Sequence, residues 1–149
     1  MWYYYLILNL IINKLTVKNI LFTLAILISF VSFGQTADEY LDSGYDKANA
    51  NDHYGAISDY TKAIELDPND ADAYYNRGSS KDDLKDYKGA ISDYTKVIEI
   101  APNYAATYLN RGVSKKNLKD YYGAIADYTK VIELDPNLAK AYYNRGISK

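Results

Sequence analysis

The sequence predicts an all-α protein, a solenoid in which pairs of helices follow one another along the chain. Two observations lead to this prediction. Proline, glycine and tyrosine recur every 34 residues, and residues 71–104 and 105–138 are identical at 23 of 34 positions. Within each period the apolar residues fall three or four positions apart, as on one face of a helix. Self-similarity at a fixed period of this length is typical of repeat architectures.

The first 34 residues differ from the rest of the chain, because all 19 acidic residues follow them. Residues 20–33 form an apolar run of 14 residues, preceded by Lys14 and Lys18. A membrane-spanning helix needs about 20 apolar residues, whereas about 7–15 are typical of a secretory signal. We therefore expect residues 1–34 to be a signal peptide that is cleaved after Gly34, with an uncleaved N-terminal membrane anchor as the alternative.

The very start of the chain does not fit the basic opening of such a signal. Residues 1–16 are mostly apolar and aromatic, whereas a signal that began at Val17 would open with Lys18 and Asn19. We interpret residues 1–16 as an over-extended start. The expected location is outside the cytoplasm (periplasmic, envelope-associated or secreted), or at a membrane if the N-terminal helix is retained.

Residues 35–149 are expected to form one helical domain. In the second repeat, Asn69 can cap a first helix over residues 71–84, and Asp86 can cap a second helix over residues 87–100. Pro102 closes this repeat, because proline cannot continue a helix. Three full repeats and the first helix of a fourth follow from the period: 37–70, 71–104, 105–138 and 139–149.

Close packing between the two helices of a repeat is predicted from small residues at fixed places. Gly78 lies inside the expected first helix, where glycine costs about 1 kcal/mol relative to alanine. Its recurrence in every repeat therefore indicates a close approach of the neighbouring helix. The second helix offers a single apolar stripe for this contact, formed by Ala90, Ile91, Tyr94, Val97 and Ile98.

These residues resemble the tetratricopeptide repeat, a 34-residue helix–turn–helix unit. The family pattern has an aromatic residue at position 4, glycine at 8, alanine at 20, an aromatic residue at 24 and proline at 32. The resemblance implies a right-handed solenoid that binds another polypeptide in its concave groove. The chain departs from the pattern at position 7, which is Ser43 or an arginine, and at position 11, which is always lysine. The second repeat matches through Tyr74, Gly78, Ala90, Tyr94 and Pro102.

One face of the first helices is the candidate binding surface that the resemblance implies. Asparagine occupies position 6 of three repeats, and its amide can pair with both the N–H and the C=O of an extended backbone. Apolar and polar side chains surround this row. The alternative is that the asparagines only satisfy local backbone groups or solvent. The predicted peptide-binding residues are Tyr75, Asn76, Ser79, Leu109, Asn110, Val113, Lys140, Tyr143 and Asn144.

A receptor for the C-terminal carboxylate of chaperones is not predicted. Of the five side chains that the carboxylate clamp of this family uses, the sequence supplies only Asn110 and Lys140. The arginines at position 7 are interpreted as structural. We expect each to pair with an aspartate at position 23 and to lie over a neighbouring tyrosine.

No enzyme, cofactor or metal site is predicted. The chain has no cysteine, which excludes disulfides and thiolate chemistry. His53, the single histidine, is expected in a solvated turn between helices, and no phosphate-binding loop or metal-ligand spacing occurs. From Gln35 onward 15 basic residues face 19 acidic ones, a balance that argues against nucleic acid as a partner.

The expected partner is therefore a protein or an extended peptide. Residues 35–83 hold 4 basic and 12 acidic residues, and residues 84–149 hold 11 and 7, so the two halves are oppositely charged. The fourth repeat stops at its first helix, which leaves Tyr142 and Ile147 on an uncapped end. One alternative is a structural role, with self-association through this end in an envelope complex. Another is that the chain is the N-terminal fragment of a larger repeat protein.

Overall fold

The computed structural model describes two units of the chain, Met1–Gln35 and Thr36–Lys149, each considered by itself. In the first unit the described residues are helical up to Ile20. The predicted apolar run and the cleavage position lie outside the described residues, apart from Ile20. Within the part that the structure describes, no helix is both long and apolar enough to cross a membrane. The described residues are 3, 5, 7, 13, 14, 16–20 and 35–148.

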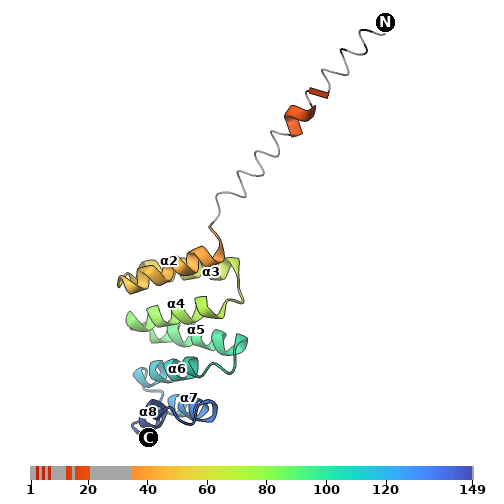
Figure 1. The fold of residues 1–149 in the computed structure, drawn as a ribbon. Coiled ribbons are helices and arrows are strands. Elements are labelled where there is room, and N and C mark those ends of the chain that lie inside the picture. The colour runs from red at the N-terminus through yellow and green to blue at the C-terminus, as the bar shows by residue number, and fades with distance from the viewer. Residues whose placement is uncertain are drawn as a thin grey trace. The chain divides into compact units, whose positions relative to one another are not determined.

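The second unit consists of α-helices joined by short turns (Figure 1), which confirms the all-α fold. The helices in residues 36–148 alternate between the first and the second helix of a repeat, as the period predicts. They are α2 (Ala37–Asn49), α3 (His53–Leu66), α4 (Ala71–Asp83), α5 (Tyr87–Ile100), α6 (Ala105–Asn117), α7 (Tyr121–Leu134) and α8 (Ala139–Gly146).

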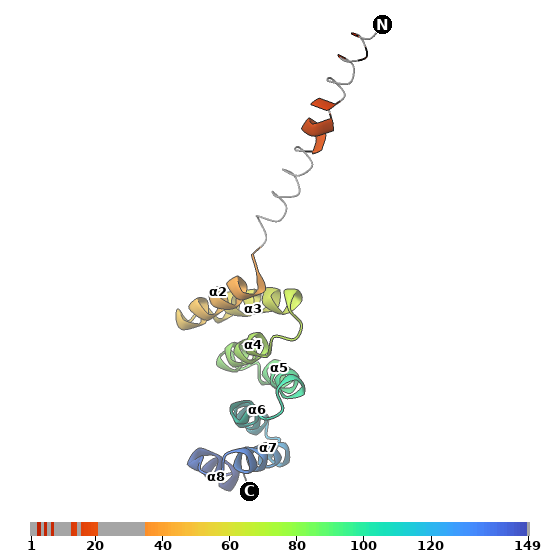
Figure 2. The ribbon, with the colours of Figure 1, turned by 45° about the vertical axis from the view of Figure 1, so that its right-hand side comes forward.

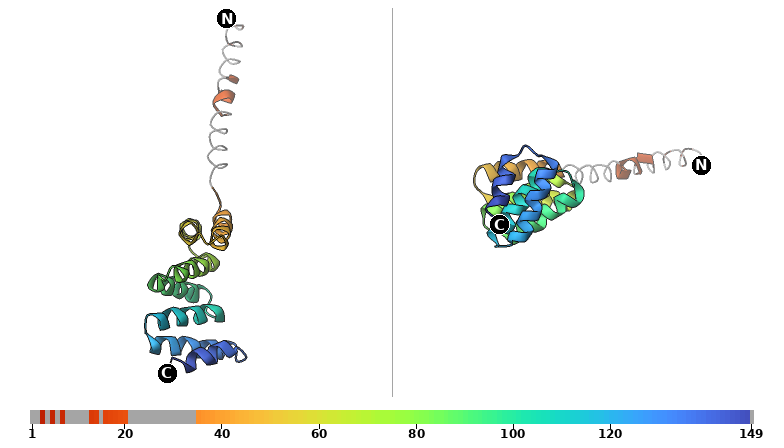
Figure 3. Two further views of the ribbon diagram at one scale, coloured as in Figure 1. Left: turned by 90° about the vertical axis from the view of Figure 1, so that its left-hand side faces the viewer. Right: turned by 90° about the horizontal axis from the view of Figure 1, so that it is seen from below.

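Each helix of the second unit packs against the next helix in the chain, so the helix pairs form a stack (Figures 1 and 2). Successive repeats approach each other most closely through their first helices, α2 with α4 and α4 with α6. Contacts between successive second helices are fewer in the described residues. The first helices therefore form the inner side of the stack, and the two views in Figure 3 show the same layering.

Aspartate side chains begin the second helices. Each accepts a hydrogen bond from the backbone N–H three residues later, which satisfies one of the donors that a helix leaves open at its N-terminus. The distances are 3.0 Å in α3, 3.0 Å in α5 and 2.9 Å in α7. The predicted cap at Asp86 is confirmed, and the other two caps are Asp52 and Asp120.

Two local predictions are wrong, both because an aspartate takes the capping position. Asp70, not Asn69, caps α4 and accepts hydrogen bonds from the N–H groups of Asp72 and Ala73 at 2.9 and 3.0 Å. Because Asp52 caps α3, His53 is the first residue of that helix rather than part of a solvated turn. Its side chain is only 19% exposed, with Nδ1 3.6 Å from a carboxylate oxygen of Asp83.

A buried tyrosine ring covers the glycine of each complete repeat. A Cβ atom built on Gly78 would lie 2.9 Å from the Tyr94 ring, closer than side chains approach in real structures, and the distances at the other two sites are 2.6 and 2.7 Å. This ring contact is the reason for the repeated glycine, and it confirms the predicted close approach. Burial also raises the pKa of the tyrosine hydroxyls in α3 and α7 to about 12. The ring–glycine pairs are Tyr60–Gly44, Tyr94–Gly78 and Tyr128–Gly112.

Candidate functional site

The predicted peptide-binding residues lie on three consecutive first helices of the inner layer. We call the surface that they occupy the first-helix face. The three helices present these residues in different environments, so each is considered separately. α4 carries Tyr75, Asn76 and Ser79; α6 carries Leu109, Asn110 and Val113; α8 carries Lys140, Tyr143 and Asn144.

On α4 two polar side chains are available to a ligand. Asn76 and Ser79 are half-buried, and neither side chain makes a hydrogen bond within the described part of the chain. The Asn76 amide therefore keeps its donor and its acceptor free for another molecule. This is the arrangement that the sequence predicted for all three asparagines.

On α6 the asparagine is already engaged. Asn110 Nδ2 donates a hydrogen bond of 2.9 Å to the hydroxyl of Tyr75. The Tyr75 ring lies against the rings of Tyr94 and Tyr104, with centroids 5.8 and 5.4 Å away. Burial, assisted by the charge of Tyr104 and opposed by the Asn110 hydrogen bond, raises the pKa of the Tyr75 hydroxyl. Only the amide oxygen of Asn110 remains for a ligand.

The asparagine of α8 is enclosed. Asn144 is 6% exposed, and its Nδ2 is buried without a hydrogen-bond partner in the described residues. Its counterpart Asn110 donates to Tyr75, but the residue one repeat later is Leu109, which has no acceptor. Leu109 itself is 8% exposed and belongs to the apolar core. The amide of Asn144 and the side chain of Leu109 are thus withdrawn from the surface.

The remaining predicted residues differ in exposure. Val113 is half-buried and packs against the core cluster of the third repeat. Lys140 is exposed, and Tyr143 is 67% exposed. The first-helix face therefore offers a free amide on α4, an amide oxygen on α6, and an aromatic ring with a cation on α8.

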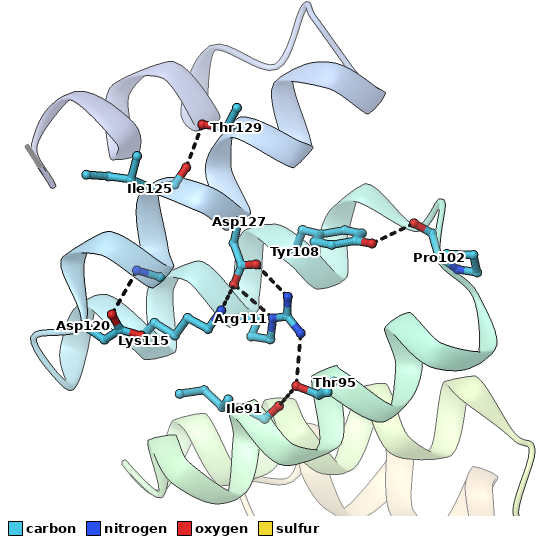
Figure 4. A network of polar contacts seen from close by, with 11 residues as sticks. Ile91, Thr95, Pro102, Tyr108, Arg111, Lys115, Asp120, Ile125, Asp127 and Thr129 are labelled. Carbon is cyan, nitrogen blue, oxygen red and sulfur yellow. Dashed lines mark hydrogen bonds and ion pairs between the residues drawn. The ribbon is translucent and has the colours of Figure 1, made fainter.

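The arginines at position 7 are structural, as predicted. Nε and Nη2 of Arg111 donate to the two carboxylate oxygens of Asp127 at 3.0 and 2.7 Å (Figure 4). Lys115 contacts the same carboxylate at 2.8 Å. Nη1 of Arg111 reaches Thr95 of the preceding second helix at 3.1 Å, and the guanidinium lies 5.6 Å from the centroid of the Tyr108 ring. The carboxylate is buried and doubly paired, so it holds helices together rather than binding a ligand.

The other repeats vary this arrangement. Arg77 repeats it with Asp93, at 2.9 and 2.7 Å. In the first repeat Ser43 and Lys47 both donate to Asp59 in place of an arginine. Burial alone would raise the pKa of Asp59, but the hydrogen bonds from Lys47 and Ser43 outweigh it and lower the pKa. The lysine at position 11, a departure from the family pattern, thus serves as a partner of the position-23 aspartate.

One polar cluster was not predicted from the sequence. Asp82 accepts hydrogen bonds from Ser114 Oγ at 2.8 Å and from the Tyr94 hydroxyl at 3.1 Å, which joins α4 to α6. Burial raises the pKa of this carboxyl, although the two donors oppose the shift. The repeat pattern gave no signal here, because position 12 is aspartate only in the second repeat. Among the described residues no group of acidic or histidine side chains could hold a metal ion.

Comparison with known families decides the assignment. The model of the tetratricopeptide repeat matches residues 71–104 and 105–138, and a second model of this repeat matches residues 45–80. The chain belongs to the tetratricopeptide-repeat family. Together the matches span residues 45–138, so the repeat assignment covers most of the second unit.

Solved structures of tetratricopeptide-repeat domains share the fold. The Arabidopsis OM64 domain is 26% identical with a TM-score of 0.72, and the match covers 76% of this chain and 93% of that one. The first domain of Spaghetti (RPAP3), bound to the HSP90 peptide SRMEEVD, is 28% identical with a TM-score of 0.73 and coverages of 76% and 90%. MamA is 26% identical with a TM-score of 0.74 and coverages of 75% and 66%. No curated protein matches the sequence.

Proposed function

We propose that this tetratricopeptide-repeat protein is a protein-interaction module that binds an extended polypeptide segment along the first-helix face. The observation that carries the proposal is the amide of Asn76, which is half-exposed and has no partner within the described residues. One repeat later, Asn110 presents an unpaired amide oxygen beside it. Two such groups on successive inner helices suit the repeating N–H and C=O groups of an extended backbone.

Each residue of the face has a distinct part in this proposal. Asn76 donates to a backbone carbonyl of the ligand and accepts from a backbone N–H. Asn110 only accepts, because Tyr75 fixes its nitrogen. Tyr143 offers an exposed ring for an apolar side chain, and Lys140 favours a ligand with an acidic group nearby. This division replaces the uniform row of three asparagines, because Asn144 is buried.

The relatives support a peptide ligand without fixing its sequence. The RPAP3 domain that shares this fold is described in complex with an HSP90 peptide. In the present chain Tyr75, Ser79 and Asn144 stand at three of the five positions of the family's carboxylate clamp, where the clamp uses other residues. The proposed ligand is therefore an internal extended segment rather than a chaperone C-terminus.

The proposal is tested with the full chain as bait in a cell extract. The Asn76→Ala, Asn110→Ala double variant is compared with an Asn103→Ala, Asn137→Ala control, which changes two exposed turn asparagines. All proteins are first matched for helical content by circular dichroism. We expect the wild type and the control to capture a common partner that the first variant loses. Equal capture by all three proteins would remove the first-helix face from consideration.

We also propose that the chain is exported. The support is the apolar run of residues 20–33, its flanking Lys14 and Lys18, and the small residues Ser32 and Gly34 before the first repeat. Sequencing the N-terminus of the mature protein is the direct test. A chain that begins at Gln35 would agree with the proposal, and an intact Met1 would contradict cleavage.

A further inference from the structure

The helix α8 repeats the packing residues of the other first helices, but its packing face is open. In α2, α4 and α6 a tyrosine ring lies on the position-8 glycine, and a Cβ there would come within 3 Å of that ring. The equivalent glycine of α8, Gly146, is exposed and has no neighbouring atom within 4 Å of such a Cβ. The same residue thus forms a filled contact three times and an open one once.

The charge on this face is also without its usual partner. Arg77 and Arg111 each form two hydrogen bonds to an aspartate of the following helix. Arg145 stands at the same position of α8 and lies over the ring of Tyr142, but no acidic side chain in the described part of the chain pairs with it. An uncompensated guanidinium therefore lies next to the open glycine.

Apolar groups surround these two residues. Tyr142 and Ile147 are exposed, and a pocket of about 320 Å³ opens where the end of α8 meets the beginning of α7. A folded chain in water rarely leaves a glycine contact, an apolar pocket and an unpaired arginine together on one face. The pocket is lined by Tyr121, Tyr122, Ile125, Ile147 and Ser148.

We propose that this face of α8 binds, in trans, an amphipathic helix of a partner protein that carries an adjacent Asp–Tyr pair. The tyrosine ring seats on Gly146, and the aspartate accepts the guanidinium hydrogen bonds of Arg145. Apolar residues one turn away on the same helix cover Ile147 and the pocket beside it. This interface is separate from the first-helix face and does not depend on a peptide bound there.

The chemistry of the occupant follows from three precedents within the chain. In each complete repeat the helix that covers the glycine carries aspartate directly before tyrosine, with the carboxylate paired to the cations of the covered helix. The pairs are Asp59–Tyr60, Asp93–Tyr94 and Asp127–Tyr128. A purely apolar helix would leave Arg145 desolvated and unpaired, which is costly. Charge complementarity therefore selects an acidic–aromatic helix.

A peptide with residues 119–136 of this chain serves as the probe, because it contains such a helix. It is labelled with fluorescein and titrated with the full chain while fluorescence anisotropy is recorded. We expect saturable binding that weakens on the order of tenfold, equivalent to about 1.4 kcal/mol, with the Gly146→Leu chain. Leucine is a better helix former than glycine, so this variant fills the open site without unfolding α8.

Two further arms sharpen the result. Peptides with Asp127→Asn or Tyr128→Ala should bind the wild-type chain several-fold more weakly, and Arg145→Gln should remove the difference between the Asp and Asn peptides. The Asn76→Ala, Asn110→Ala chain should bind the probe as the wild type does, because those residues lie on the other face. This control separates the failure of this proposal from the failure of the first.

Three outcomes would overturn the proposal. They are the absence of saturable binding, binding that Gly146→Leu leaves unchanged, and equal binding of the Asp127→Asn peptide. A full chain that forms dimers by sedimentation, and loses them on Gly146→Leu, would assign the face to a second copy instead.

Discussion

The helices α6 and α8 share most of their sequence but occupy different environments. Both carry an Asn-Arg-Gly segment followed two residues later by serine. In α6 the arginine is tied to Asp127 and the glycine is covered by Tyr128, because α7 packs on them. In α8 the same two residues have neither contact among the described residues. The function of a repeat residue is thus set by the helix that follows, not by its own identity.

This comparison also explains why the two ends of the stack cannot be judged from the consensus. In a solenoid each repeat contacts only its neighbours, so stability is close to a sum of repeat and interface contributions. An interior substitution removes interface contacts, whereas the same substitution on α8 removes almost none. Four matched pairs or controls can break or sharpen this contrast.

The largest difference is expected between the two arginines. Arg111→Ala leaves the buried Asp127 with Lys115 alone, and we expect the free energy of unfolding to fall by about 2 kcal/mol, since breaking buried ion pairs is strongly destabilising. Arg145→Ala should change it by less than about 0.5 kcal/mol. Urea unfolding followed by circular dichroism measures both. Equal losses would show that α8 is packed like α6.

The glycines should differ in the sign of their effect. A methyl group on Gly112 would lie 2.7 Å from the buried Tyr128 ring, so Gly112→Ala should cost about 1–3 kcal/mol through overpacking. Gly146→Ala meets no atom and should be neutral or stabilise by up to about 1 kcal/mol, because alanine favours the helix. Thermal unfolding of the two variants gives the comparison. A stabilising Gly112→Ala would contradict the ring contact.

A smaller effect is expected for the tyrosine hydroxyls. Tyr75→Phe removes the acceptor of Asn110 and should reduce the free energy of unfolding by about 1 kcal/mol. Tyr143→Phe, on the exposed ring of α8, makes the same chemical change without breaking a hydrogen bond and should have no effect. Urea midpoints at equal slopes would report the difference. A neutral Tyr75→Phe would mean that water replaces the hydroxyl.

The smallest effect concerns pH and the link between α4 and α6. Burial raises the folded-state pKa of Asp82, so the contribution of this group to stability is fully present below its unfolded pKa and is lost as pH rises through the folded value. Asp82→Asn keeps an acceptor for Ser114 and removes the charge. The variant should therefore gain stability relative to the wild type as pH rises from acid to neutral, unlike the exposed control Asp42→Asn. A constant or shrinking difference would contradict the burial argument.

The sequence was a good guide to the fold, because each repeat restates the same helical period and the same small residues. The position-7 arginine and position-23 aspartate were also predictable, since opposite charges recur at one spacing. The binding face was less predictable. Whether an asparagine is free, bonded or buried depends on a residue one repeat earlier, which is Tyr75 for Asn110 and Leu109 for Asn144. Single capping aspartates likewise displaced the expected places of Asn69 and His53.

The bond from Arg111 to Thr95 has a consequence for how such an array can lengthen. The arginine takes one contact from the preceding repeat and the remainder from its own, and Arg77 does the same with Thr61. Each junction is therefore made from residues that every copy of the unit already contains. Thr129 stands ready at the corresponding place in α7. Duplication of a 34-residue stretch would create a compatible joint at once, with no compensating substitution at the seam.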